Sequence, residues 1–150
     1  MTIFTFERTK FAKSFMKKPK EIDKIAFIEI QEGKILSTRS KGKTKYYIPG
    51  GKREKGESDQ QTLIREIAEE LSVVIIPNTA IHIGNFSAQS DGAKEGIKVL
   101  MTCYKAKYTG HLKACSEIEE IRWLSYSDLD IISEVDKKIF LFLHQKGQLI

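Results

Sequence analysis

The sequence lacks several features that define large classes of proteins. It has only 2 cysteines in 150 residues, and neither lies in a CxxC or Cys/His spacing, which argues against a disulfide framework or a zinc site. No apolar run approaches the roughly 20 residues of a membrane span, and the N-terminus lacks the continuous apolar core of a signal peptide. We therefore expect a cytoplasmic protein without a membrane partner.

Several common catalytic patterns are missing as well. The chain contains no GxxxxGK[ST] phosphate-binding loop and no readable Ser/His/Asp or Cys/His arrangement. The mutual spacing of His82, His111 and His144 is not typical of a metal cluster or a proton relay, so we expect structural or solvated roles for them. These absences leave the acidic residues as the main candidates for chemistry.

The composition and charge pattern predict one domain with a basic N-terminal arm. With 41% hydrophobic residues and no low-complexity tract, the chain can bury a core of its own. The net charge is +5, and basic residues concentrate in 8–24. We divide the chain into an arm, residues 1–23, and a single domain, residues 24–150. Phenylalanines at helical spacing indicate that the arm docks on the domain or on a second subunit of a homodimer. Its basic charge leaves RNA binding as a further alternative.

The pattern of apolar and turn-forming residues predicts a mixed α/β fold. We expect strands at 24–30, 34–40, 73–76, 80–87, 97–108 and 121–124, with the first two forming a hairpin through 31–33. A C-terminal helix is expected to start from a cap in 125–128 and to end near Lys146.

The candidate chemistry lies in residues 46–73. An advance of 100° per residue predicts a helix with one apolar face and, on the opposite face, three neighbouring carboxylates at i, i+3 and i+4: Glu66, Glu69 and Glu70. Like charges at this spacing destabilise a helix by about 0.2–0.5 kcal/mol per pair. Carboxylates clustered on one rigid element are the ligands that Mg²⁺ or Mn²⁺ requires. The pattern therefore favours a divalent-cation site.

The start of this helix and the turn before it can also be predicted. Ser58 and Gln61 fit a capping box, so the helix should begin near Ser58. Pro49, Gly50 and Gly51 predict a turn whose backbone can approach a cation or a phosphate, because no side chain stands in the way.

The spacing of these residues resembles the Nudix box, GX5EX7REUXEEXGU, where U is a bulky aliphatic residue. Gly51 is followed after five residues by Glu57 and after seven more by REIAEELSV, residues 65–73, and the preceding YYIPGGK is also similar to the family. Ser72 stands where the family has glycine. A left-handed conformation there would cost a non-glycine residue about 1–2 kcal/mol, so we expect strain or a different cap rather than lost chemistry.

The resemblance implies a fold and a set of site residues. The fold is the Nudix fold, an α/β/α sandwich around a mixed β-sheet. The implied metal ligands are Glu66, Glu69 and Glu70, with the Gly50 carbonyl as a further ligand. Arg65 and Glu57 would form a buried supporting pair that fixes the carboxylate geometry.

The base and the substrate contacts remain open at this stage. The base is Glu66 in one scheme known in the family and a distal-loop residue in another, for which the chain offers Glu95, Glu117, Glu119 and Glu120. Of these we favour Glu120 or Glu119 as a further catalytic or metal-binding residue. Arg39 and Lys52 are the candidate substrate-binding residues.

The activity implied by the resemblance is hydrolysis of a nucleoside diphosphate linked to another group, with Mg²⁺ or Mn²⁺ as cofactor. Signatures of ADP-ribose and diadenosine polyphosphate hydrolases are absent, since Gln89, Ser90 and Asp91 stand in that region. By elimination we predict a MutT-like enzyme that converts a nucleoside triphosphate, including oxidised guanine nucleotides, into the monophosphate and pyrophosphate. The expected partner is thus a small nucleotide rather than nucleic acid. Four alternatives are a nucleotide-sugar or ADP-ribose pyrophosphatase, an RNA 5′-end pyrophosphohydrolase, a silent nucleotide sensor and a prenyl diphosphate isomerase; no cysteine beside the box supports the last.

Overall fold

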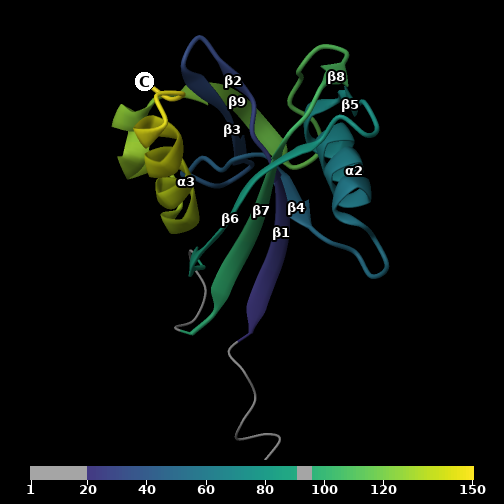
Figure 1. Ribbon diagram of the computed structural model, residues 1–150, viewed down its shortest axis with the longest axis horizontal. Coiled ribbons are helices and arrows are strands. Elements are labelled where there is room, and N and C mark those ends of the chain that lie inside the picture. Colours follow the sequence, from purple (N-terminus) through teal and green to yellow (C-terminus); the bar gives the residue numbers. More distant parts are fainter. Residues whose placement is uncertain (1–19, 91–95) are drawn as a thin grey trace, which may run out of the picture.

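The computed structural model describes residues 20–90 and 96–150, which form a four-stranded, a three-stranded and a two-stranded β-sheet together with two α-helices and a 3₁₀ helix (Figure 1). The N-terminal arm as far as residue 19, together with Glu95, lies outside the described residues. In the described part, no helix has the length and apolar character needed to cross a bilayer.

The central sheet has four strands in the order β4-β1-β7-β6. Their bounds are Gly50–Lys52 for β4, Glu21–Phe27 for β1, Lys98–Lys105 for β7 and Ile81–Gln89 for β6. Strands β1 and β7 run parallel, whereas β4 and β6 are antiparallel to their neighbours. The sheet is therefore mixed, as expected.

A second sheet has the order β2-β3-β9, from Ile30–Gln31, Lys34–Ser40 and Ile118–Leu124. Two short strands, β5 at Val74–Ile75 and β8 at Tyr108–Thr109, pair separately. Helix α2 spans Asp59–Leu71, the 3₁₀ helix η1 spans Tyr126–Ile131, and α3 spans Glu134–Gln145.

The central sheet separates two hydrophobic clusters. Successive residues of β1 point to opposite faces, so Ile25 packs in the cluster under α2 while Ala26 packs in the cluster under α3. The predicted apolar face of α2 is buried against the first cluster through Leu63, Ile67 and Leu71. Helix, sheet and helix thus form the expected α/β/α arrangement (Figure 1).

The start of α2 follows the sequence prediction, and its end takes the left-handed conformation that was one of the two expectations. Ser58 caps the N-terminus: the backbone N–H of Gln61 donates to Ser58 Oγ at 3.1 Å, and Gln61 Oε1 accepts from the Ser58 N–H at 2.9 Å. Ser72 ends the helix in the left-handed conformation, with φ 59° and ψ 27°, and its N–H donates to the Ala68 carbonyl. The serine therefore takes the conformation that glycine adopts at no steric cost.

Two strand predictions were wrong because the chain changes sheets without a turn signal. The expected strand 24–30 divides at 28–29: the Ile28 N–H donates to the Tyr104 carbonyl in the central sheet, whereas the Glu29 carbonyl accepts from Leu36 in the second sheet. Only Ile30–Gln31 forms the hairpin with β3, and β1 begins earlier than expected, at Glu21. The expected strand 97–108 likewise divides into β7 and β8.

Two further local predictions need correction. Gly50 and Gly51 form β4, paired with Ala26 and Ile25 of β1, rather than a turn. The cap at Ser125 starts η1, and α3 has its own cap, Ser133, whose Oγ accepts from the Asp136 N–H. The C-terminal helix is therefore shorter at its start than expected.

The left-handed conformation of Ser72 yields a stability prediction. Ser72→Gly should raise the free energy of unfolding by about 1 kcal/mol, because glycine lacks the Cβ that makes a positive φ cost about 1–2 kcal/mol, while its extra freedom in the unfolded chain offsets part of the gain. Urea unfolding measures the difference. Ser72→Ala keeps the Cβ and should give no gain, so an equal gain in both variants would contradict the explanation.

Candidate active site

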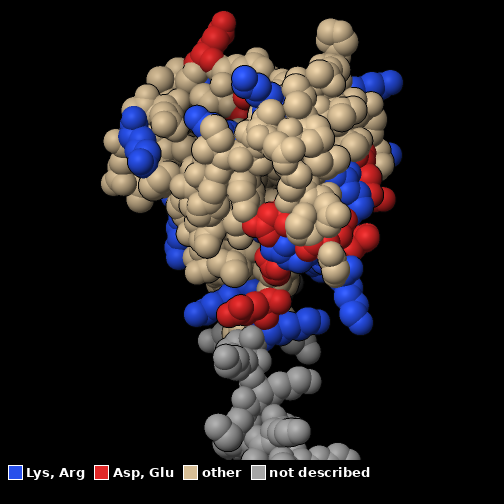
Figure 2. All heavy atoms as spheres, turned by 45° about the vertical axis from the view of Figure 1, so that its right-hand side comes forward, with Lys and Arg blue, Asp and Glu red and all other residues tan. Residues whose placement is uncertain are grey.

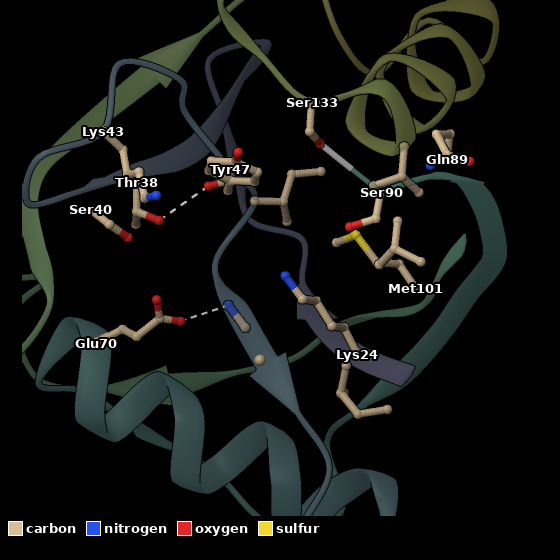
Figure 3. Close-up of a pocket in the computed structure, with 16 residues that line it drawn as sticks. Lys24, Thr38, Ser40, Lys43, Tyr47, Glu70, Gln89, Ser90, Met101 and Ser133 are labelled. Carbon is tan, nitrogen blue, oxygen red and sulfur yellow. Dashed lines mark hydrogen bonds between the residues drawn. The ribbon is translucent and has the colours of Figure 1, made fainter. Parts of the chain in front are cut away.

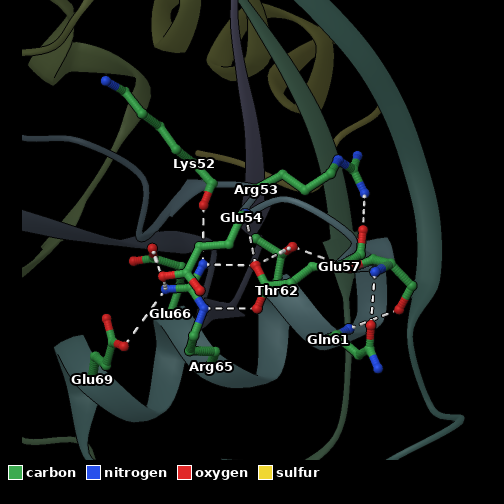
Figure 4. Close-up of polar contacts among 10 residues, drawn as sticks. Lys52, Arg53, Glu54, Glu57, Gln61, Thr62, Arg65, Glu66 and Glu69 are labelled. Atoms are coloured by element: carbon green, nitrogen blue, oxygen red, sulfur yellow. Dashed lines mark hydrogen bonds and ion pairs between the residues drawn. The ribbon is translucent and has the colours of Figure 1, made fainter.

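Arg65 connects the loop before α2 to the carboxylates of the helix (Figure 4). Its Nε and Nη2 donate to the two carboxylate oxygens of Glu57 at 2.8 and 2.9 Å, in a bidentate pair. Nη1 donates to Glu66 Oε1 at 2.9 Å, and Nη2 also donates to the Lys52 carbonyl at 3.0 Å. The predicted Arg65–Glu57 pair therefore forms, half-buried rather than buried, and it orients Glu66 as well.

Glu57 is held in its charged form by several donors. Its carboxylate also accepts from the Glu54 N–H at 2.8 Å and from Thr62 Oγ1 at 3.1 Å. The hydrogen bonds from Arg65, followed by the one from the Glu54 backbone, lower the pKa of Glu57 to about 2. The same carboxylate raises the pKa of Arg65. Glu57 is thus suited to support the loop rather than to exchange protons.

A second set of contacts anchors the loop to the central sheet. Arg53 donates to Asp23 at 3.0 Å and pairs with Asp59 in the first turn of α2, and Tyr104 of β7 donates to Asp59. Acidic and basic side chains consequently lie intermingled over this part of the surface, rather than in patches of one sign (Figure 2). These pairs fix the start of α2 relative to β1 and β7.

Gly51 and Gly50 allow two close approaches that a larger residue would prevent. A Cβ at position 51 would lie 2.3–2.5 Å from the carboxyl atoms of Glu66, and a Cβ at position 50 would lie 2.0 Å from the Ile25 carbonyl oxygen. Gly50 also has φ 143°, which L-residues rarely adopt. The glycines therefore bring β4 against β1 and against the carboxylates of α2.

Glu70 lies at the junction of the helix and β4. Its Oε1 accepts from the Gly50 N–H at 2.8 Å. Burial, with the charges of Glu66 and Glu69 adding to it, raises the pKa of Glu70 to about 7 despite the Gly50 hydrogen bond and the positive charge of Lys24, which lower it. The negative charge on this face of α2 is thus only partly neutralised by the protein.

The carboxylates suit a hard divalent cation in their chemistry and their placement on one helix face. Glu66 lies in the cradle left by Gly51, Glu70 accepts from Gly50, and the more exposed Glu69 lies 3.5 Å from Arg65 Nη1. Among the described residues no three His, Cys, Asp or Glu side chains converge closely enough to hold a metal. Binding a cation with this set therefore requires the carboxylates to move closer together.

A cavity of about 280 Å³ opens beside Glu70 and Gly50 (Figure 3). It lies between the central sheet, strand β3 with the loop that follows it, and the start of α3. Its apolar lining includes Ile48, Val99, Met101 and Val135, and its polar lining includes Lys24, Lys43, Gln89, Ser90 and Ser133. The box helix and the cavity thus share the edge of the sheet formed by β4.

The remaining predicted residues lie elsewhere. Arg39 and Glu120 face each other across β3 and β9, with Nη2 and Oε2 3.2 Å apart, and Glu119 lies 3.4 Å from Arg39 Nη1. A hydrogen bond with Tyr46, then one with Arg39, lowers the pKa of Glu120. In the described part of the chain neither Arg39 nor Glu120 lines the cavity, and Lys52 is exposed. Their catalytic and substrate-binding roles stay predictions.

Sequence reasoning did not identify Lys24, Ser133 or the cavity role of Lys43. Lys24 lies on the same face of β1 as Ile22 and Ala26, because every second residue of a strand points the same way. A lysine at an inward position of an apolar strand was the sequence signal that could have identified it. Lys43 lies in a polar, basic loop, a pattern that is typical of ordinary surface charge. Ser133 carried no signal that separated it from an ordinary helix cap.

A model of the NUDIX domain matches residues 21–143, so the chain belongs to the Nudix family. It is a Nudix pyrophosphohydrolase, and enzymes of this family act on pyrophosphate bonds of nucleoside diphosphates linked to a further group. No curated protein matches the chain.

Solved structures show the same fold. The ORF135 protein of E. coli has a TM-score of 0.67 at 24% identity, over 85% of this chain and 92% of its own. The MutT protein of Methanosarcina mazei Go1 has a TM-score of 0.68 at 20% identity, over 88% of this chain and 98% of its own. A UDP-X diphosphatase has a TM-score of 0.62 at 16% identity, over 95% of this chain and 71% of its own.

The lowered pKa of Glu57 predicts a pH-dependent contribution to stability. Because its folded-state pKa is about 2 against an ordinary value of 4.5, the ion pair stabilises the fold fully above about pH 4.5 and loses this effect as the pH falls towards 2. Glu57→Gln should therefore be less stable than the wild type near neutral pH, and the gap should narrow at about pH 3.

Urea unfolding at the two pH values measures this gap. Glu54→Gln is the matched control, since Glu54 is exposed and its carboxylate lies 3.7 Å from Arg65. A gap for Glu57→Gln that is the same at both pH values would contradict the assignment.

Proposed function

We propose that the chain hydrolyses a nucleoside triphosphate to the monophosphate and pyrophosphate with Mg²⁺ or Mn²⁺ as cofactor. The observation that carries the proposal is the position of Glu70, which belongs to the carboxylate face of the Nudix-box helix and also lines the cavity. A nucleoside seated in the cavity would place its phosphates beside the carboxylates.

The cavity lining supports a nucleoside as its occupant. The side chains of Ile48, Met101 and Val135 offer apolar surface to a flat base, while the nearby Gln89 and Ser133 can bond to its polar edge. A volume of about 280 Å³ lies just below the range of about 300–1,000 Å³ for ligand pockets, which suits one nucleoside better than a dinucleotide.

The carboxylates of α2 would hold the cation. Glu66, Glu69 and Glu70, with the Gly50 carbonyl, are the proposed ligands. A divalent cation at such a site neutralises phosphate charge and makes bound water more acidic. Arg65 orients Glu66 through Oε1, which leaves Oε2 of Glu66 to take a proton from the attacking water. We retain Glu66 as the proposed base, because Glu120 is paired with Arg39.

A substrate screen tests the proposed function. Nucleoside triphosphates should release pyrophosphate with Mg²⁺ or Mn²⁺, and nucleotide sugars, ADP-ribose and 5′-triphosphate RNA should react more slowly. Preference for a nucleotide sugar would overturn the triphosphate proposal in favour of that alternative. Glu70→Gln should lower turnover at least about 100-fold, since even partners outside the direct ligand set cost 10–100-fold.

Stability measurements provide the control for Glu70→Gln. Burial raises the pKa of Glu70 to about 7, so its charged form destabilises the metal-free fold as the pH rises through this value. Glu70→Gln should therefore unfold at a higher urea concentration than the wild type at about pH 8 with EDTA. A Glu70→Gln variant with normal turnover would contradict the role of Glu70 as a metal ligand. A variant that unfolds at a lower urea concentration than the wild type would contradict the destabilising effect of the buried Glu70 charge.

The two glycines of β4 predict a contrast between activity and folding. Gly51→Ala should keep a near-normal melting temperature but lose at least about 10-fold in turnover, because its Cβ displaces only the flexible end of Glu66. Gly50→Ala should lower the melting temperature, because its Cβ would meet the β1 backbone. A fully active Gly51→Ala variant would show that the Glu66 cradle is not required.

A further inference from the structure

Lys24 has the position of a substrate-binding residue that the sequence analysis did not assign. Its side chain rises from β1 and is half-buried, and its ammonium points into the cavity between Glu70 and Met101 (Figure 3). In the described part of the chain, this ammonium makes no hydrogen bond and no ion pair within 4 Å. A half-buried charge without an acceptor is costly, so an acceptor from a ligand would complete the site.

The order of strands places Lys24 between two parts of the cavity. Strand β4, with Gly50 and Gly51, is the edge next to the carboxylates, β1 with Lys24 is the next strand, and β7 with Met101 follows. Neighbouring strands are about 4.8 Å apart. A ligand that extends from the box across the sheet therefore reaches Lys24 before it reaches the apolar surface.

Electrostatics agrees with this placement. Lys24 and Glu70 both line the cavity, so the ammonium can act on a group bound beside the box. An ammonium and a phosphate oxygen form a charge-assisted hydrogen bond, which is about twice as strong as a neutral one. An apolar ligand, or a base without its phosphate, would not form such a charge-assisted hydrogen bond with Lys24.

We propose that Lys24 binds the α-phosphate of the nucleotide and so positions the nucleoside end of the substrate relative to the carboxylates. The proposal rests on the proposed function, in which the nucleoside occupies the cavity and the phosphates lie beside α2. The α-phosphate joins these two parts and stays with the nucleoside monophosphate after hydrolysis. Lys24 therefore also binds this product.

Binding of nucleoside monophosphates without metal tests the proposal. Titrations by calorimetry and by NMR use the four 5′-monophosphates and their nucleosides, with EDTA present. Lys24→Met should weaken binding of the preferred monophosphate about 10- to 100-fold, as expected for a lost hydrogen bond to a charged group, and should leave nucleoside binding unchanged. Lys24→Gln should show a similar loss and serves if the methionine variant folds poorly.

Two lysine variants separate a direct contact from general attraction. Lys105→Met, an exposed position on the same strand as Met101, should bind like the wild type. Lys43→Met removes the other lysine of the cavity, and its effect should be smaller and should vanish at high salt. Equal, salt-sensitive losses in Lys24→Met and Lys43→Met would overturn the contact.

The remaining outcomes distinguish the two proposals. Unchanged monophosphate binding in Lys24→Met, or an equal loss for monophosphate and nucleoside, would overturn the role of Lys24 and leave the nucleotide cavity standing. A wild-type protein that binds no monophosphate and no nucleoside would overturn both proposals. A loss confined to the monophosphate supports both.

Discussion

Repulsion among carboxylates on one face of α2 is the constraint on which the rest of the site depends. The charges of Glu66 and Glu69 add to the burial that raises the pKa of Glu70. The protein offsets part of this cost with one guanidinium, that of Arg65, and one backbone N–H, that of Gly50. The negative charge that stays unneutralised lowers the stability of the metal-free protein. It also makes this face of the helix suited to a divalent cation.

Close packing at β4 brings this helix face to the cavity. Helix α2 covers one face of the central sheet, whereas the cavity lies over the opposite face, under α3. Glu70 can line the cavity because β4 is a short edge strand of two glycines and a lysine. Since Gly50 lies directly against the β1 backbone, a side chain there would separate the helix from the sheet.

The features that were predicted correctly depend on residues close in sequence. The Ser58 cap and the apolar face of α2 each involve residues within about one or two turns of the helix. The wrong predictions of strands and of the glycine turn came from sequence patterns that fit two different local structures. Alternation of apolar residues continues through 28–29 although the chain changes sheets there, and a pair of glycines serves a tight turn as well as a close strand pairing.

The sequence by itself determined the family, the box helix with its caps, and the carboxylate face, because helical periodicity and fixed spacing place these side chains without knowledge of the rest of the chain. Only the tertiary structure decided which residues surround the cavity. Lys24, Lys43, Glu70 and Ser133 come from four separate segments, and their proximity results from sheet order and packing rather than from any local pattern. For the same reason Arg39 and Glu120, which sequence placed near the substrate, pair with each other across β3 and β9.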